Sequence, residues 1–101
     1  MNIVVSKHAY DRAKERLGLN KKSADRMAMK AYEQGIDGNS LKGSIQRYIL
    51  NKIESHEEME SHIYLYGDKA WVFGGYGNRL VLVTILNLSQ EMTRRYKLQV
   101  A

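Results

Sequence analysis

HIYLYGDKAWVFGGYGNRLVLVTIL, residues 62–86, is the stretch that decides the fold. Aromatic and β-branched residues gather here with a period of two, a pattern that favours β-strands. We expect strands over His62–Tyr66, Lys69–Phe73 and Leu80–Leu86. Gly67-Asp68 fits a tight hairpin turn, and residues 74–78 fit a looser connection. The third strand is apolar on both faces, which is typical of a central strand covered on both sides.

Before residue 62 the apolar residues recur with the 3.6-residue period of helices. We expect a first helix that Ser6 caps and Gly18 ends, and a second helix that Asn20 caps and Gly35 ends. Residues 2–5 fit a short strand. A third helix is expected from Ser40, because its apolar residues have the spacing of a core-facing side: Leu41, Ile45, Tyr48, Ile49 and Ile53.

Helices followed by strands indicate the α+β class. The expected architecture is two to three N-terminal helices packed on a C-terminal antiparallel sheet of three to four strands. A chain of 101 residues is too short for two independent cores, so we expect a single domain over residues 1–101. Its helical part spans residues 6–55, its sheet part residues 62–88 and a basic tail residues 89–101.

The composition excludes several kinds of chemistry. The chain has no Cys and no Pro, which excludes disulfides, thiolate nucleophiles, Cys-ligated zinc and Pro-rich ligand motifs. His8, His56 and His62 lack metal-site spacing, and no serine-hydrolase elbow is present, so we expect no metal and no cofactor. No run of 18 apolar residues occurs. We therefore expect a cytoplasmic protein of a bacterial host cell, without membrane contact.

Positive charge is concentrated in the first two helices. The chain has 16 Lys and Arg against 11 Asp and Glu, a net charge of +5, and residues 6–30 alone carry a net +5. A short acidic run, Glu54, Glu57, Glu58 and Glu60, follows the helical part. The basic helices are expected to form a docking face for a polyanion or to be a solvated surface. The residues of this predicted face are Lys7, Arg12, Lys14, Arg16, Lys21, Lys22, Arg26 and Lys30, together with Tyr76 as an exposed ring.

Two further groups of residues allow a functional and a structural interpretation. His8, Arg12, Glu15 and Arg16 share one side of the first helix. They fit a ribonuclease site, with His for proton transfer and Arg for phosphate, or a set of structural pairs such as Arg12 with Glu15. Tyr64, Tyr66 and Trp71 on the predicted hairpin fit base stacking or a place in the core, and we expect most of them in the core.

The pattern Ser6-Lys7-His8-Ala9, Arg12, Glu15-Arg16, Gly18-Leu19, followed by Lys42-Gly43, Tyr64-Leu65-Tyr66-Gly67 and Leu82-Val83-Thr84-Ile85-Leu86, resembles a family. Small phage and mobile-element proteins with an HAxxRxxER opening share it, some of them with a RelE/barnase-like nuclease fold. The sequence departs from the family at residues 74–78 and 87–89. The resemblance implies a phage accessory protein that binds host machinery, including defence complexes that carry guide RNA.

Three functions follow from these observations. The first is a non-enzymatic accessory protein that binds RNA or a host nucleoprotein, such as a CRISPR effector, through its basic helices. The second is a RelE-like, metal-independent ribonuclease toxin that uses His8 or His62 as general acid or base and Arg12, Arg16 and Arg79 for phosphate. The third is a protein-only adaptor or homodimer, in which the small-residue helix face of Ala24, Ala28 and Ala31 packs against a copy of itself.

Overall fold

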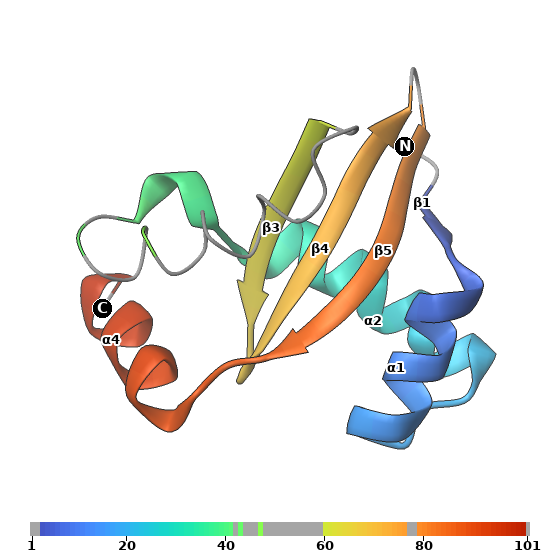
Figure 1. The fold of residues 1–101 in the computed structure, drawn as a ribbon, viewed down its shortest axis with the longest axis horizontal. Helices are drawn as coiled ribbons and strands as arrows, with labels where there is room; N and C mark the ends of the chain where they lie inside the picture. Colours follow the sequence, from blue (N-terminus) through green and yellow to red (C-terminus); the bar gives the residue numbers. More distant parts are fainter. Residues whose placement is uncertain (1–2, 42, 44–46, 48–59, 77–78, 101) are drawn as a thin grey trace.

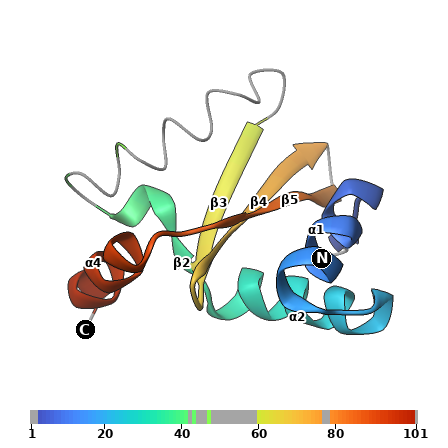
Figure 2. The same ribbon diagram turned by 60° about the horizontal axis from the view of Figure 1, so that its bottom comes forward.

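The computed structural model describes residues 3–41, 43, 47, 60–76 and 79–100, which form a sheet with helices on both sides (Figures 1 and 2). The strands are β1 (Ile3–Val5), β2 (Ile36–Asp37), β3 (Glu60–Tyr66), β4 (Lys69–Tyr76) and β5 (Arg79–Asn87). The helices are α1 (Lys7–Leu17), α2 (Lys21–Gln34) and α4 (Gln90–Val100), with a short 3₁₀ turn, η1, at Gly38–Ser40. Helices α1 and α2 pack on one face of the sheet, and α4 on the other.

The α+β class and the three predicted strands are confirmed, but the sheet is larger than expected. Within the described part of the chain it has five strands, in the order β1-β5-β4-β3-β2. Strands β2 to β5 pair antiparallel, whereas β1 runs parallel to β5, with Ile3 opposite Leu80 and Val5 opposite Leu82. The sheet is therefore mixed. Its last strand, β5, is followed in the chain by a further helix, α4. Strand β5, which we expected to be central, is an interior strand that pairs with β1 on one edge and with β4 on the other. The middle position of the sheet belongs to β4.

The helix boundaries follow the predicted caps. The Ser6 side chain accepts a hydrogen bond from the Ala9 backbone N–H (3.1 Å), and the Asn20 side chain accepts one from Ser23 (2.8 Å). Gly18 ends α1 with φ 65°, a left-handed conformation that glycine adopts without steric cost. The predicted tight turn also forms, with a positive φ at Gly67 (64°), as a type II′ hairpin turn requires at its first central residue.

Small residues on α1 and α2 let these helices approach the sheet closely. Ala9, Ala13, Ala24, Ala28 and Ala31 are at most 1% exposed and pack against Trp71, Phe73 and Leu82. The alanine face proposed for a homodimer is thus filled by the chain's own core, so that prediction is wrong in its contact surface. Packing inside the molecule removes this apolar face from water without a second copy.

The hairpin aromatics pack in the core or against it: Trp71 is buried, and Tyr64 and Tyr66 are partly buried. Trp71 is 1% exposed, and Tyr64 packs edge-to-face with Tyr32 (5.3 Å between ring centroids) and with Phe73 (5.7 Å). Such edge-to-face pairs stabilise a core beyond the area they bury, by about 0.5 to 1.5 kcal/mol each. The base-stacking interpretation is therefore wrong for Trp71, and Tyr64 is partly buried against the core.

The predicted basic tail is instead the helix α4. The Ser89 side chain accepts a hydrogen bond from the Met92 backbone N–H (3.1 Å), as an N-cap does. Met92 and Tyr96 are four residues apart and pack on the second face of the sheet, with Ile63, Leu65 and Val72. The apolar spacing of these two residues, and not the basic residues between them, determines the structure of this segment.

One predicted connection is part of a strand, and one predicted helix lies mostly outside the described residues. Residues 74 and 75 were expected in a connection, but they belong to β4, where Gly75 pairs with both Glu60 and Leu80. The predicted third helix beyond Leu41 lies almost wholly outside the described residues, as do His56 and the acidic residues Glu54, Glu57 and Glu58. The same holds for the side chains of Glu60 and Tyr76.

Candidate functional site

The basic side chains of the first helix divide between its two flanks. An α-helix turns by about 100° per residue, so Lys14 shares a flank with Tyr10, and Arg12 shares the opposite flank with Arg16. Tyr10 Oη donates a hydrogen bond to an Asp25 carboxylate oxygen on α2 (2.6 Å). The flank of Lys14 therefore faces α2, and the flank of Arg16 faces β5.

Arg12 and Arg16 are both engaged within the molecule. Arg12 Nη1 lies 2.6 Å from Glu15 Oε2, so the structural pairing foreseen for Arg12 forms. Arg16 Nη1 donates a hydrogen bond to the Ile85 carbonyl oxygen of β5. Arg16 thus has a structural partner in the backbone of β5 and not in a carboxylate of its own helix. Neither guanidinium belongs to the surface that faces α2.

Four other cations gather around two adjacent hollows on α1 and α2. The first hollow, of about 450 Å³, lies where α1 ends and α2 begins, and Lys14, Lys21 and Asp11 contribute its charged groups. The second, of about 240 Å³, is lined by Leu19, Ser23, Arg26, Met27 and Lys30. Leu19 lines both hollows, so they lie side by side. We call Lys14, Lys21, Arg26 and Lys30 the α1–α2 basic surface.

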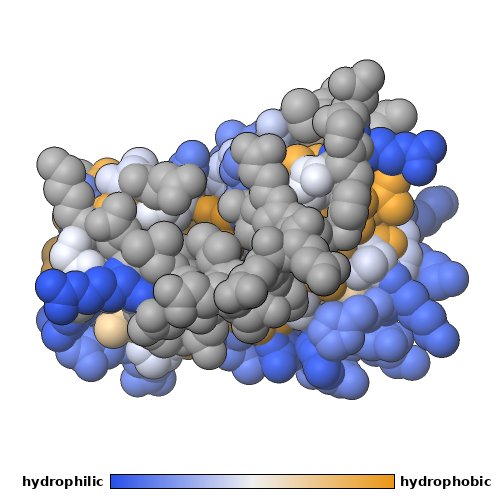
Figure 3. Space-filling model, turned by 45° about the horizontal axis from the view of Figure 1, so that its top comes forward, coloured by the Kyte–Doolittle hydropathy of each residue, from blue (hydrophilic) through white to orange (hydrophobic). Residues whose placement is uncertain are grey.

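The α1–α2 basic surface carries an excess of positive charge, which Asp11 in the first hollow and Asp25 beside it offset in part. Its four cations are all exposed, and among the described lining residues of the two hollows Asp11 is the one acidic residue. Among the described residues, none of the four cations forms an ion pair. In Figure 3 hydrophilic side chains dominate the right side of the molecule, where α1 lies.

A polar contact fixes the geometry between the two helices. The hydrogen bond from Tyr10 to Asp25 raises the pKa of the Tyr10 phenol, and burial and the negative charge of Asp25 act in the same direction. Lys21 Nζ lies 5.7 Å from the centroid of the Tyr10 ring, a cation–π distance. Tyr10 therefore joins α1 to α2 and holds Lys21 at the edge of the first hollow. Sequence reasoning missed this role, because nothing local in the chain links residue 10 to residue 25.

The remaining predicted binding residues lie outside the α1–α2 basic surface. Lys7 and Lys22 are exposed but line neither hollow. Sequence reasoning also missed Leu19, Ser23 and Met27, which give the second hollow its uncharged walls. Helical periodicity would have placed Ser23 beside Arg26 and Met27 beside Lys30, since residues three or four apart share a side.

The residues of the ribonuclease hypothesis do not converge on one cleft. Arg16 is anchored at Ile85, whereas Arg79 begins the same strand six residues earlier, which corresponds to about 20 Å along β5. His62 is on β3. Strand β4 lies between β3 and β5, so β3 and β5 are about 10 Å apart. General acid–base catalysis needs its groups within hydrogen-bond reach of one substrate. His8, Arg12 and Arg16 are neighbours on α1, but His62 and Arg79 are elsewhere.

Comparison of the chain with protein-family models, with curated proteins and with solved structures finds no match. Within the described ranges, no three His, Asp or Glu side chains gather as metal ligands would. None of the described helices is both long and apolar enough to cross a membrane.

Proposed function

We propose that the protein is a non-enzymatic binding module whose α1–α2 basic surface docks on the phosphate backbone of RNA, either free or held in a host nucleoprotein. The observation that carries the proposal is the gathering of four exposed cations around two adjacent hollows, with one carboxylate among their lining residues. A phosphate backbone supplies regularly spaced negative charges, and each contact releases condensed counterions. A phage or mobile-element origin, and a defence complex such as a CRISPR effector as the target, rest on the family resemblance alone.

The surface favours contacts to phosphate over contacts to bases. Tyr10 lines the first hollow. Its ring already makes a cation–π contact with Lys21, and its hydroxyl group donates a hydrogen bond to Asp25. Stacking on a base would require an open ring face. Lysine and arginine at an exposed surface recognise charge without reading sequence. We therefore propose binding with little sequence preference, in the bacterial cytoplasm.

A binding role is favoured over catalysis by the contacts that the arginines on the His and Arg side of α1 already make. Arg12 is paired with Glu15, and Arg16 holds a backbone carbonyl of β5. A guanidinium that stabilises a transition state must instead face the scissile phosphate. Arg12 and Arg16 therefore have structural contacts, whereas the cations of the α1–α2 basic surface are available to a ligand.

The test is fluorescence anisotropy with a labelled single-stranded RNA of mixed sequence, about 12 nucleotides long. The affinity is measured from about 50 to about 500 mM salt. Four phosphate contacts predict a slope of about −3 in a plot of log affinity against log salt concentration. Each of the substitutions Lys14→Glu, Lys21→Glu, Arg26→Glu and Lys30→Glu should reduce the steepness of the slope by about 1 and weaken binding.

Arg79→Glu is the matched control, because it makes the same charge change at an exposed residue on the first position of β5. It should keep the slope of the wild-type protein. Binding that is independent of salt, or absent at the lowest salt concentration, would contradict the proposal. A loss with Arg79→Glu as large as that with Arg26→Glu would instead favour the set of residues expected for the ribonuclease.

A further inference from the structure

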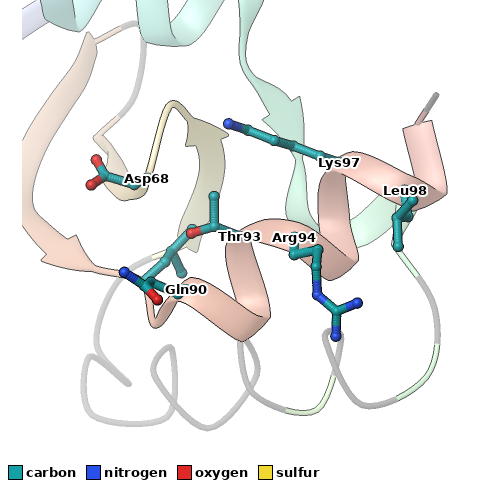
Figure 4. Close-up of a pocket in the computed structure, with 7 residues that line it drawn as sticks. Asp68, Gln90, Thr93, Arg94, Lys97 and Leu98 are labelled. Carbon is teal, nitrogen blue, oxygen red and sulfur yellow. The ribbon is translucent and has the colours of Figure 1, made fainter.

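A third hollow lies on the opposite side of the sheet from the α1–α2 basic surface. It has a volume of about 460 Å³, within the usual range of ligand-binding pockets, and it lies between α4 and the turn that joins β3 to β4 (Figure 4). Its lining residues are Asp68, Leu88, Gln90, Thr93, Arg94, Lys97 and Leu98. We call it the α4 hollow.

The walls of the α4 hollow are held by contacts to the hairpin turn. The Leu88 backbone N–H donates a hydrogen bond to the Asp68 carbonyl oxygen (3.0 Å), and Tyr96 Oη donates one to the Gly67 carbonyl oxygen. Tyr96 is 4% exposed and lies in the core of this face. The hollow is thus a fixed feature of the fold, with one wall from α4 and the other from the turn.

The charge of the α4 hollow is positive. Its carboxylate, Asp68, already accepts a 2.8 Å ion-paired hydrogen bond from Lys69, a residue that is 9% exposed. Arg94 and Lys97 line the hollow without an ion pair among the described residues. In Figure 4 the Lys97 side chain extends from α4 toward the side of the hollow where Asp68 lies. Asp68 offsets part of the positive charge, since Lys69 and, to a lesser degree, Lys97 lower the pKa of its carboxyl group, and Arg94 adds a second cation for a ligand at this place.

A large apolar side chain is exposed at the α4 hollow. Leu98, which lines the hollow, is 66% exposed. Arg94 and Leu98 are four residues apart, so a guanidinium and a large apolar side chain lie next to each other on α4, and both project from the same side of the helix in Figure 4. Apolar side chains this exposed, next to a pocket, are a feature of docking sites for other proteins.

We propose that the α4 hollow binds a short acidic peptide segment of a partner protein, with a large apolar side chain between Leu88 and Leu98 and carboxylates facing Arg94 and Lys97. A peptide fits better than a small molecule, because Leu98 leaves most of its surface exposed at the hollow, where a longer ligand can cover it. The protein then has two recognition surfaces on opposite faces of its sheet, one for a polyanion and one for an acidic, apolar peptide. Such a protein can bring a polyanion and a second protein together.

The test starts from a random 12-residue peptide library displayed on phage and selected on the intact protein. Enriched peptides should combine Leu, Phe or Trp with neighbouring Asp or Glu. A synthetic, fluorescein-labelled copy of the most enriched peptide is then titrated with the wild-type protein and with variants. Leu98→Asp should weaken its binding about 10- to 100-fold, the effect of losing one buried leucine side chain. Lys97→Glu should weaken it in a salt-dependent manner.

Arg79→Glu is again the control of equal charge change, since Arg79 lies at the other end of β5 from Leu88. Leu98 is exposed, so Leu98→Asp should keep the thermal unfolding midpoint, which circular dichroism verifies. The proposal is overturned by a selection that enriches no acidic, apolar motif, or by peptides that bind Leu98→Asp as tightly as the wild-type protein. It is also overturned if light scattering shows a wild-type dimer that Leu98→Asp converts to a monomer, because a second copy then covers the hollow. None of these outcomes depends on RNA binding.

Discussion

Replacing Arg16 with alanine tests whether this residue holds the edge of the sheet. Strand β1 pairs with β5 only as far as Leu82, so the outer edge of β5 beyond that point has no neighbouring strand. Ser6 and α1 take over this edge. The Ser6 backbone N–H donates to the Leu82 carbonyl oxygen (3.1 Å), Ser6 Oγ donates to the Val83 carbonyl oxygen (3.1 Å), and Arg16 donates to that of Ile85.

Arg16→Ala leaves the Ile85 carbonyl group without its protein donor. A hydrogen bond that involves a charged group contributes about 1.5 to 3 kcal/mol, and this bond is partly buried, so we expect a loss of about 2 kcal/mol. For a chain of this size that corresponds to a decrease in the unfolding midpoint on the order of 10 °C. Circular dichroism during heating and during urea titration measures both quantities.

Arg12→Ala is the matched control for this experiment. It removes a guanidinium from the same flank of α1 but breaks only the Arg12–Glu15 pair, whose side chains are 32% and 58% exposed. Exposed pairs contribute little, so this variant should lose less than about 0.5 kcal/mol. If Arg16→Ala is no less stable than Arg12→Ala, Arg16 does not support the sheet edge, and its guanidinium is available for the nuclease role.

Two further predictions concern the tyrosines of the core. Tyr96→Phe removes the hydrogen bond to the Gly67 carbonyl oxygen and should cost about 1 kcal/mol in urea unfolding; an unchanged midpoint would show that the bond does not anchor α4. Burial raises the pKa of the Tyr64 and Tyr96 phenols, with Asp37 and Asp68 as further causes, so the folded state retains these protons to higher pH than the unfolded chain. The stability they contribute is therefore complete below the unfolded pKa of about 10 and decreases as the pH rises through it, which urea titrations on both sides of that pH measure. A urea midpoint that stays constant across this range would contradict buried phenols.

Local features of the structure could be predicted from the sequence. Ser6, Gly18 and Asn20 act within three or four residues of their own position, so residue type and spacing are sufficient to locate the ends of α1 and the start of α2. The hairpin of β3 and β4 is equally local. Helix α4 could also have been predicted, because Ser89 caps it and Met92 and Tyr96 have helical spacing. We predicted a basic tail instead, because Arg94, Arg95 and Lys97 lie in this segment.

Contacts between distant parts of the chain could not be predicted in this way. Ser6 and Val83 are 77 positions apart, and Arg16 and Ile85 are 69 positions apart. Helical periodicity correctly grouped Arg12 with Arg16, yet nothing in one helix indicates which flank meets a strand and which flank meets another helix. The division of the predicted basic face into engaged arginines and exposed cations therefore required the tertiary structure.

The most direct test of the proposed function is to map where RNA touches the protein. Backbone amide signals of nitrogen-15-labelled protein are followed by NMR during titration with the single-stranded RNA, at low salt. We predict shifts concentrated in the end of α1 and the first half of α2, around Lys14, Lys21 and Arg26, which disappear as salt is added. Shifts centred instead on Arg79 and the start of β5, or spread evenly over the chain, would contradict a docking surface on these two helices.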